Sequence, residues 1–258
     1  MLFKAYFDGG NDPYDPESHW VTLSAIFSDP YSLNSFAREW RRVLATHSVE
    51  YLHTTDAVKN KRHDLLCDCT SVIAEHIVTD NTFRGIIPAT VTINAKEFRK
   101  VRDEIPNGPQ ILTETLASQT LDRLISGGRE IAMRQGEDDR KVFYSLFFDR
   151  GEPYRGHIED RMRHPVFRRT VLEKDGVDVE RYIQVHPPLD SKQFPELQAA
   201  DLFSWCYNHR HNISFEWQYW MMDIRSDSVL LDRAALTKPE WTTVNFVNSL
   251  NLPPRAKR

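Results

Sequence analysis

The chain has 258 residues, of which 40% are hydrophobic, so it can bury the core of one large domain. Its formal net charge of −4 provides no overall attraction for nucleic acid. A nucleic-acid partner would therefore have to be held by a local basic patch or by metal ions.

The first residues and the cysteines indicate where the protein acts. The segment MLFKAYFD reaches an acidic residue before the apolar part of a signal peptide could form. No apolar run approaches the roughly 18 residues that span a bilayer. Cys67, Cys69 and Cys206 lack the spacing of a zinc site, so we expect reduced, buried thiols. These features predict a cytoplasmic protein with no membrane partner.

The first part of the chain predicts two strands followed by helices. Aromatic and β-branched residues predict strands over 2–7 and 19–27, joined by a turn of Gly, Asn, Asp and Pro. Apolar residues four apart predict a helix over 31–45. The segment 51–57 is expected to be extended or a loop, and a second helix is expected over 60–80.

The middle of the chain predicts a strand and a long helix. The strand covers 83–95, where Pro88 indicates a bulge or a sheet edge. The helix covers about 110–135, and Gly127 and Gly128 favour a kink or break within it.

The last third continues the alternation of strands and helices. It predicts a strand over 141–149, a basic helix that ends by Pro165, a strand over 180–186 and a helix over 195–210. Such alternation predicts an α/β protein with a mixed central sheet covered by helices on both sides.

Three aspartates interrupt apolar segments. Asp8 and Asp149 each follow an apolar strand and precede a turn, GGND and RGEP respectively. Ligands of open α/β sheets gather beyond the carboxyl ends of strands. Asp201 interrupts the apolar surface of the helix PELQAADLFSWC, with Gln198 one turn before it. Each aspartate also has a structural interpretation, as a turn or cap residue or as an acid bonded to a nearby backbone or arginine group.

Convergence of the three aspartates would favour a metal site. Close carboxylates raise one another's pKa unless a cation neutralises them. Oxygen ligands without a thiolate suit Mg²⁺ or Mn²⁺. Two such ions about 4 Å apart can activate water and stabilise the leaving oxygen in phosphodiester hydrolysis. In that scheme Asp8 bridges the ions, and Asp149 and Asp201 each complete one site.

The segment 155–169, RGHIEDRMRHPVFRR, has five arginines and two histidines. One interpretation is a solvated helix face that its two acidic residues partly balance. The other is a phosphate-binding surface that includes Arg155, Arg161 and Arg163.

Four segments together resemble the domain-of-unknown-function family 3800 over roughly residues 1–210. They are Asp8-Gly9-Gly10, Asp149, Asp190-Ser191-Lys192 and Leu197-Gln198-Ala199-Ala200-Asp201. That family is similar to the ribonuclease H-like fold of nucleases, integrases and junction resolvases. The resemblance implies a ribonuclease H-like domain over 1–210 and an aromatic-rich extension over 211–258.

The resemblance also implies auxiliary site residues. Glu50 and His53 are candidates for a fourth metal ligand. His53 could instead transfer a proton, or its imidazole could simply be hydrogen-bonded within a loop. Ser191 and Lys192 join Gln198 as further candidates, and Lys192 would hold a phosphate.

Two functions follow from these residues. Retention of the three aspartates favours a Mg²⁺- or Mn²⁺-dependent nuclease, or a related phosphodiesterase, that acts on DNA or RNA. Family members often have an Asp-Glu-Ser-Gly-like first turn, whereas here the assisting acid is absent or displaced to Asp12. That departure favours a catalytically silent ribonuclease H-like module that binds nucleic acid or a protein partner.

The extension over 211–258 is rich in tryptophan. Trp217, Trp220 and Trp241 fit base stacking. They also fit packing on the domain or at the interface of a homo-oligomer. No Gly-rich nucleotide motif follows a strand, so we expect no nucleotide cofactor.

Overall fold

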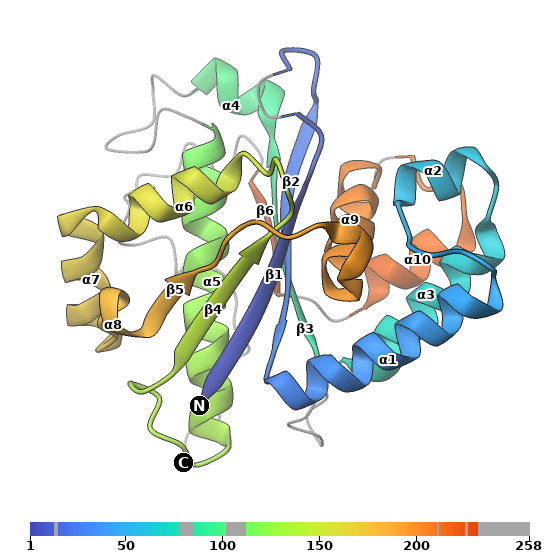
Figure 1. Ribbon diagram of the computed structural model, residues 1–258. Coiled ribbons are helices and arrows are strands. Elements are labelled where there is room, and N and C mark those ends of the chain that lie inside the picture. Colours follow the sequence, from blue (N-terminus) through green and yellow to red (C-terminus); the bar gives the residue numbers. More distant parts are fainter. Residues whose placement is uncertain (13–14, 78–84, 102–111, 211, 225–226, 232–258) are drawn as a thin grey trace.

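The structure, a computed structural model, describes residues 1–12, 15–77, 85–101, 112–210, 212–224 and 227–231. Its strands are β1 (Leu2–Gly10), β2 (Trp20–Ser28), β3 (Ile87–Asn94), β4 (Phe143–Phe148), β5 (Ile183–Val185) and β6 (Asp227–Leu231). They form a six-stranded sheet in the order β5-β4-β1-β2-β3-β6 (Figure 1). β2 is antiparallel to β1 and β3, whereas the β1–β4, β4–β5 and β3–β6 pairs are parallel. The predicted mixed α/β sheet is confirmed.

Helices lie on both sides of this sheet (Figure 1). One side has α1 (Pro30–Thr46), α2 (Thr54–Lys59), α3 (His63–His76), α9 (Pro195–Asn208) and α10 (Glu216–Asp223). The other side has α4 (Ala95–Val101), α5 (Leu112–Arg134), α6 (Tyr154–Arg163), α7 (Pro165–Asp175) and α8 (Val179–Tyr182). A short 3-10 helix, Ser191–Gln193, precedes α9. Within the described ranges, no helix combines the length and apolar character that a bilayer crossing requires.

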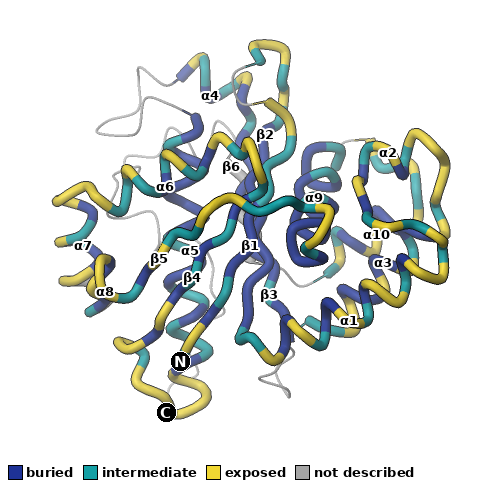
Figure 2. Tube along the Cα trace, in the orientation of Figure 1, coloured by how far each residue is buried: buried dark blue, intermediate teal, exposed yellow. Residues whose placement is uncertain are grey.

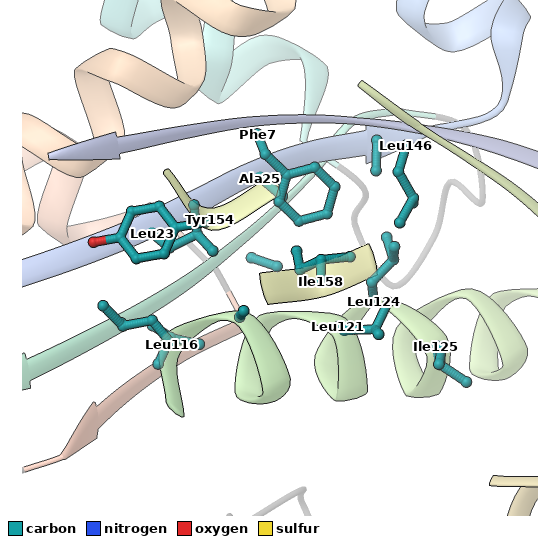
Figure 3. Close-up of a cluster of buried hydrophobic side chains, with 14 of the residues drawn as sticks. Phe7, Leu23, Ala25, Leu116, Leu121, Leu124, Ile125, Leu146, Tyr154 and Ile158 are labelled. Carbon is teal, nitrogen blue, oxygen red and sulfur yellow. The ribbon is translucent and has the colours of Figure 1, made fainter. Parts of the chain in front are cut away.

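Side chains of the central strands alternate between two hydrophobic cores, as the two-residue period of a strand requires. Phe7 and Leu23 face α5 and share a core with Leu121 (Figure 3). Tyr6 and Ile26 face the opposite core, which includes α1, α3 and α9. Figure 2 shows buried positions along the central strands and exposed positions on the outer helices. Because both faces of β1 and β2 are covered, these strands are nearly continuous apolar runs in the sequence.

Local sequence signals set several helix ends. Asp29 caps α1, because its Oδ1 accepts hydrogen bonds from Tyr31 N at 2.8 Å and Ser32 N at 3.1 Å. α6 ends at Arg163, before Pro165, as predicted. The basic segment then continues as α7, since proline suits the first position of a helix. The arginine-rich segment is therefore two helices.

Several predicted boundaries are wrong because tertiary pairing changes them. β1 continues through Asp8 to Gly10, since β2 stays paired with it to that point. The segment 51–57 contains the start of α2. Residues 180–182 belong to α8, which leaves β5 with three residues. Pro88 does not mark an edge strand, because β3 pairs with both β2 and β6, and Pro88 precedes the residues that pair with β6.

The first part of the predicted C-terminal extension packs on the rest of the chain. α10 contacts α3 and α9, and β6 adds a strand beside β3. Trp217 is buried, with its ring centroid 5.5 Å from that of Trp205, whereas Trp220 is exposed. Trp217 therefore serves packing. Trp241 and residues 232–258 lie outside the described residues, and the homo-oligomer stays a prediction.

α5 passes through Gly127 and Gly128 as one continuous helix, so the alternative of a break is wrong. A Cβ at Gly128 would lie 2.6 Å from the Tyr144 hydroxyl, and one at Gly127 would lie 3.1 Å from the Phe27 ring. Tyr144 also donates a hydrogen bond to the Ile125 carbonyl at 3.0 Å. The two glycines therefore let α5 approach the sheet closely.

Gly128→Ala should lower the free energy of unfolding by about 1–3 kcal/mol, because the fully buried Tyr144 has no room to move away from the added methyl group. Gly156→Ala is the matched control, since Gly156 is also in a helix and has open space around it. That substitution should raise the free energy of unfolding by about 0.5–1 kcal/mol. Chemical denaturation measures both. Equal stabilisation by the two substitutions would contradict the packing of α5 on Tyr144.

Candidate functional site

The parallel pairing of β1 with β4 places Asp8 beside Asp149. The register runs to the residues immediately before them, and Asp149 N donates to Phe7 O at 3.4 Å. Asp8 shares the face of Tyr6, and Asp149 shares that of Phe147, whose rings stack with centroids 4.9 Å apart. Because side chains alternate along a strand, both carboxylates project to the face that carries α9. The two strands are neighbours, as a shared site requires.

α9 brings Asp201 to the same place. This helix packs across β1 and β2. Asp201 Oδ2 accepts a hydrogen bond from Thr54 N at 2.8 Å, which joins α9 to the start of α2. Ser204, three residues later, donates its hydroxyl to the Asp8 carbonyl at 2.8 Å. Hydrogen bonds therefore hold Asp201 in fixed relation to β1.

Glycine allows this close approach of α9 to β1. A Cβ at Gly10 would overlap the Asn208 side-chain nitrogen and would lie 3.0 Å from Ser204 Cβ. In the sequence, Gly10 stands out only as part of the turn after Asp8. The structure shows that it lies within β1 and that its lack of a side chain makes room for α9.

The Asp190-Ser191-Lys192 segment also reaches the site. Asp149 Oδ1 accepts a hydrogen bond from Ser191 N at 2.9 Å. Lys192 lies next to this contact, with its ammonium group 5.0 Å from the centroid of the Tyr51 ring. A backbone amide thus faces Asp149, and Lys192 is the next residue in the chain.

Asp8 lies at the centre of the negative charge. It is partly exposed, as are Asp149 and Asp201. Burial raises the pKa of Asp8 well above its usual range, and the charges of Asp201, Glu152 and Asp149 raise it further. The nearby amide of Gly9, which donates to Glu152, acts in the opposite direction. The site therefore concentrates carboxylates that favour either a proton or a cation between them.

Asp201 has a similar environment. Burial raises its pKa, hydrogen bonds from Thr54 and the charge of His53 lower it, and Asp149 raises it. His53 is exposed and its Nδ1 lies 2.9 Å from Asp56 Oδ2. His53 therefore lies near Asp201, oriented by a second carboxylate. The other auxiliary candidate, Glu50, is exposed in the loop before α2.

Glu152 is a fourth carboxylate of the site, and it was not predicted from the sequence. Its Oε2 accepts a hydrogen bond from Gly9 N at 2.7 Å. Burial raises the pKa of Glu152 to about 7, against the hydrogen bonds from Gly9 and Tyr154, and the charge of Asp149 adds to the rise. The available signal was its position in the RGEP turn, three residues after Asp149. The direction of its side chain depends on how that turn folds.

The side chain of Gln198 links several segments around the site by hydrogen bonds. Its side chain is buried, and its Oε1 accepts hydrogen bonds from Trp40 Nε1 at 2.9 Å and Leu52 N at 3.0 Å. Its Nε2 donates to the carbonyls of Ser191 at 2.9 Å and Lys192 at 3.3 Å. One amide thus joins α9 to α1, to the segment before α2 and to the segment that contacts Asp149.

The three arginines proposed to bind phosphate contact protein groups. Arg155 and Arg163 pair with Glu159 at 2.9 Å and 3.4 Å within α6. Arg161 lies with its guanidinium carbon 4.5 Å from the Phe167 ring centroid, and burial lowers its pKa. The ion pairs within α6 fit the solvated-face interpretation for Arg155 and Arg163. Phosphate binding by these residues stays a prediction.

No protein-family model matches this chain, and no curated protein sequence is similar to it. The resemblance to the domain-of-unknown-function family 3800 therefore stays a prediction. In the part of the chain that the structure describes, no three or more His, Cys, Asp or Glu side chains are arranged to hold a metal ion.

Gln198→Met should lower the free energy of unfolding by about 1–3 kcal/mol, because it keeps the side-chain volume but leaves buried hydrogen-bond donors and acceptors without partners. Gln193→Met, at an exposed position of the same segment, should have little effect. Urea denaturation of the two variants measures the difference. If both variants unfold at the same urea concentration, Gln198 does not hold these segments together.

Proposed function

We propose that the chain is a metal-dependent nuclease or a related phosphodiesterase with a ribonuclease H-like fold. The observation that carries the proposal is the meeting of Asp8, Asp149 and Asp201 from β1, the end of β4 and α9 on one face of the sheet. Carboxylates in such surroundings repel one another, and a cation removes that repulsion. Their hard oxygen atoms suit Mg²⁺ or Mn²⁺.

The topology supports the fold assignment. β2 is antiparallel to β1 and β3, and β4 and β5 then add in parallel on the other side of β1. The acids lie where β4 ends beside β1, which agrees with ligand binding at the carboxyl ends of strands in open α/β sheets.

Each side chain has a role in the proposed reaction. Two Mg²⁺ or Mn²⁺ ions about 4 Å apart would activate water and stabilise the leaving oxygen in an in-line displacement at phosphorus. In this proposal Asp8, Asp149 and Asp201 would hold the cations, and Asp8, whose pKa both other aspartates raise, would be shared between them. Lys192, beside the contact to Asp149, supplies a cation for a substrate phosphate.

A binding module without catalytic activity is the alternative. The absence of an acid directly after Asp8 favours this binding module. Glu152 lies beside Gly9 and supplies a further carboxylate there, which weakens the argument against a nuclease. In both functions the partner is nucleic acid, although a protein partner is a second option for the silent module. A cleavage assay decides between them.

Millimolar Mn²⁺ or Mg²⁺ should raise the melting temperature of the wild type, because a ligand that binds the native state stabilises it by about 2.7 kcal/mol at 100 times its dissociation constant. Asp149→Asn should reduce this rise. Asp160→Asn, at an exposed position on α6, should not. Equal rises in the wild type and in Asp149→Asn, measured by differential scanning fluorimetry, would place the ions elsewhere.

Asp201→Asn should reduce cleavage more than about 100-fold, since even groups that only orient metal ligands contribute 10- to 100-fold. Folding should be retained or slightly improved without metal, because the asparagine oxygen can still accept from Thr54 N while one repelling charge is removed. The assay uses single-stranded, duplex and branched DNA and RNA with Mn²⁺, with thermal melts alongside and Asp160→Asn as the control.

Two results would contradict these roles. A wild type that binds one of the substrates and cleaves none would support the binding module in place of the nuclease. Loss of about 1–3 kcal/mol of stability in Asp201→Asn with unchanged cleavage would mean that Asp201 is structural.

A further inference from the structure

β4 turns away from β1 at Asp149, and Glu152 fills the resulting gap. In a continuing parallel ladder, the Asp149 carbonyl would accept the Gly9 N–H. Here that carbonyl accepts from Glu152 N at 3.2 Å instead. The Gly9 N–H donates to the Glu152 carboxylate at 2.7 Å. One side chain therefore replaces a backbone acceptor where the two strands separate.

The surroundings hold Glu152 in this position. Its second oxygen, Oε1, accepts from Tyr154 N at 3.3 Å, at the start of α6. A Cβ on Gly9 would lie 2.6 Å from the Tyr154 ring and 3.0 Å from Glu152 Oε2. Position 9 therefore suits glycine because Glu152 and Tyr154 occupy the adjacent space. The carboxylate joins β1 to the beginning of α6 through two backbone amides.

We propose that Glu152 is a positioning residue for the metal centre, acting through Asp8. This inference rests on the proposed function. The hydrogen bond from Gly9 N fixes the peptide that follows Asp8 and so limits the positions that the Asp8 side chain can take beside β4. Without that bond, Gly9 would keep its pairing with β2 but would lose the contact that fixes it on the β4 side. A hydrogen bond to a charged acceptor is about twice as strong as a neutral one, and metal sites need ligands held within about 0.5 Å.

Substitutions at position 152 separate this role from direct metal ligation. Glu152→Gln keeps the length and one acceptor oxygen but removes the charge. Glu152→Asp keeps the charge but is too short to reach Gly9 N from the same backbone. Glu152→Ala removes both the charge and the acceptor. If Glu152 positions Asp8, Glu152→Gln should keep more Mn²⁺ affinity than Glu152→Asp or Glu152→Ala. If Glu152 binds the metal directly, Glu152→Asp should keep more affinity than Glu152→Gln.

The measurements are calorimetric titration with Mn²⁺ alone, cleavage kinetics, and hydrogen exchange of the Gly9 amide by NMR. Glu152→Ala and Glu152→Asp should weaken Mn²⁺ binding and lower kcat by about 10- to 100-fold, in the range found for groups that orient metal ligands. Glu152→Gln should recover most of both losses and keep the Gly9 amide protected. Glu75→Ala, at an exposed position on α3, should match the wild type.

The outcomes distinguish this inference from the nuclease proposal. If Glu152→Gln binds Mn²⁺ as weakly as Glu152→Ala while Gly9 stays protected, the charge itself is needed and the positioning role is wrong. If Glu152→Ala does not fold, the relative Mn²⁺ affinities of Glu152→Gln and Glu152→Asp still distinguish positioning from ligation. If the wild type binds Mn²⁺ but cleaves no substrate, only the nuclease proposal is overturned. The Mn²⁺ affinities of the variants then still test the positioning role of Glu152. A wild type that binds no Mn²⁺ overturns both.

Discussion

Repulsion among carboxylates is the constraint on which the site depends. Asp8, Asp149, Asp201 and Glu152 lie together where burial raises the pKa of three of them. The fold offsets the repulsion with backbone amides, which carry partial positive charge at fixed positions. The donors are the N–H groups of Gly9, Thr54 and Ser191, from three separate segments. A bound cation would remove the repulsion that these amides only reduce, which links the electrostatics directly to the proposed function.

The packing of α9 gives this arrangement its geometry. The helix carries Asp201, and it lies close to β1 because Gly10 has no side chain. Gln198, on the same helix, holds the segments that supply amides to Asp201 and Asp149. A single helix thus provides a candidate ligand and the hydrogen bonds that keep its neighbours in place. Such coupling of stability to site geometry is expected where a buried polar network is fully paired.

The elements that the sequence predicted well are those with strong local patterns. β2, α1 and α9 have regular apolar patterns, and the two helices begin at clear start signals, Asp29 and Pro195. α2, α8 and β5 were assigned wrongly because each is short, and neighbours in space decide their conformation. Gly127 and Gly128 show the same limit. Local propensity favours a kink or a break there, but the helix is continuous, and the small size of the two residues allows it to contact the sheet.

The candidate acids could be recognised from the sequence alone, because an aspartate that ends or interrupts an apolar run is visible without a structure. Asp8, Asp149 and Asp201 all have this signature. Only the tertiary structure decided which other groups join them. Glu152 reaches Gly9 because β4 turns away from β1, and Gln198 connects segments that are far apart in the chain. Both roles depend on side-chain direction and on distant partners, which neither composition nor spacing encodes.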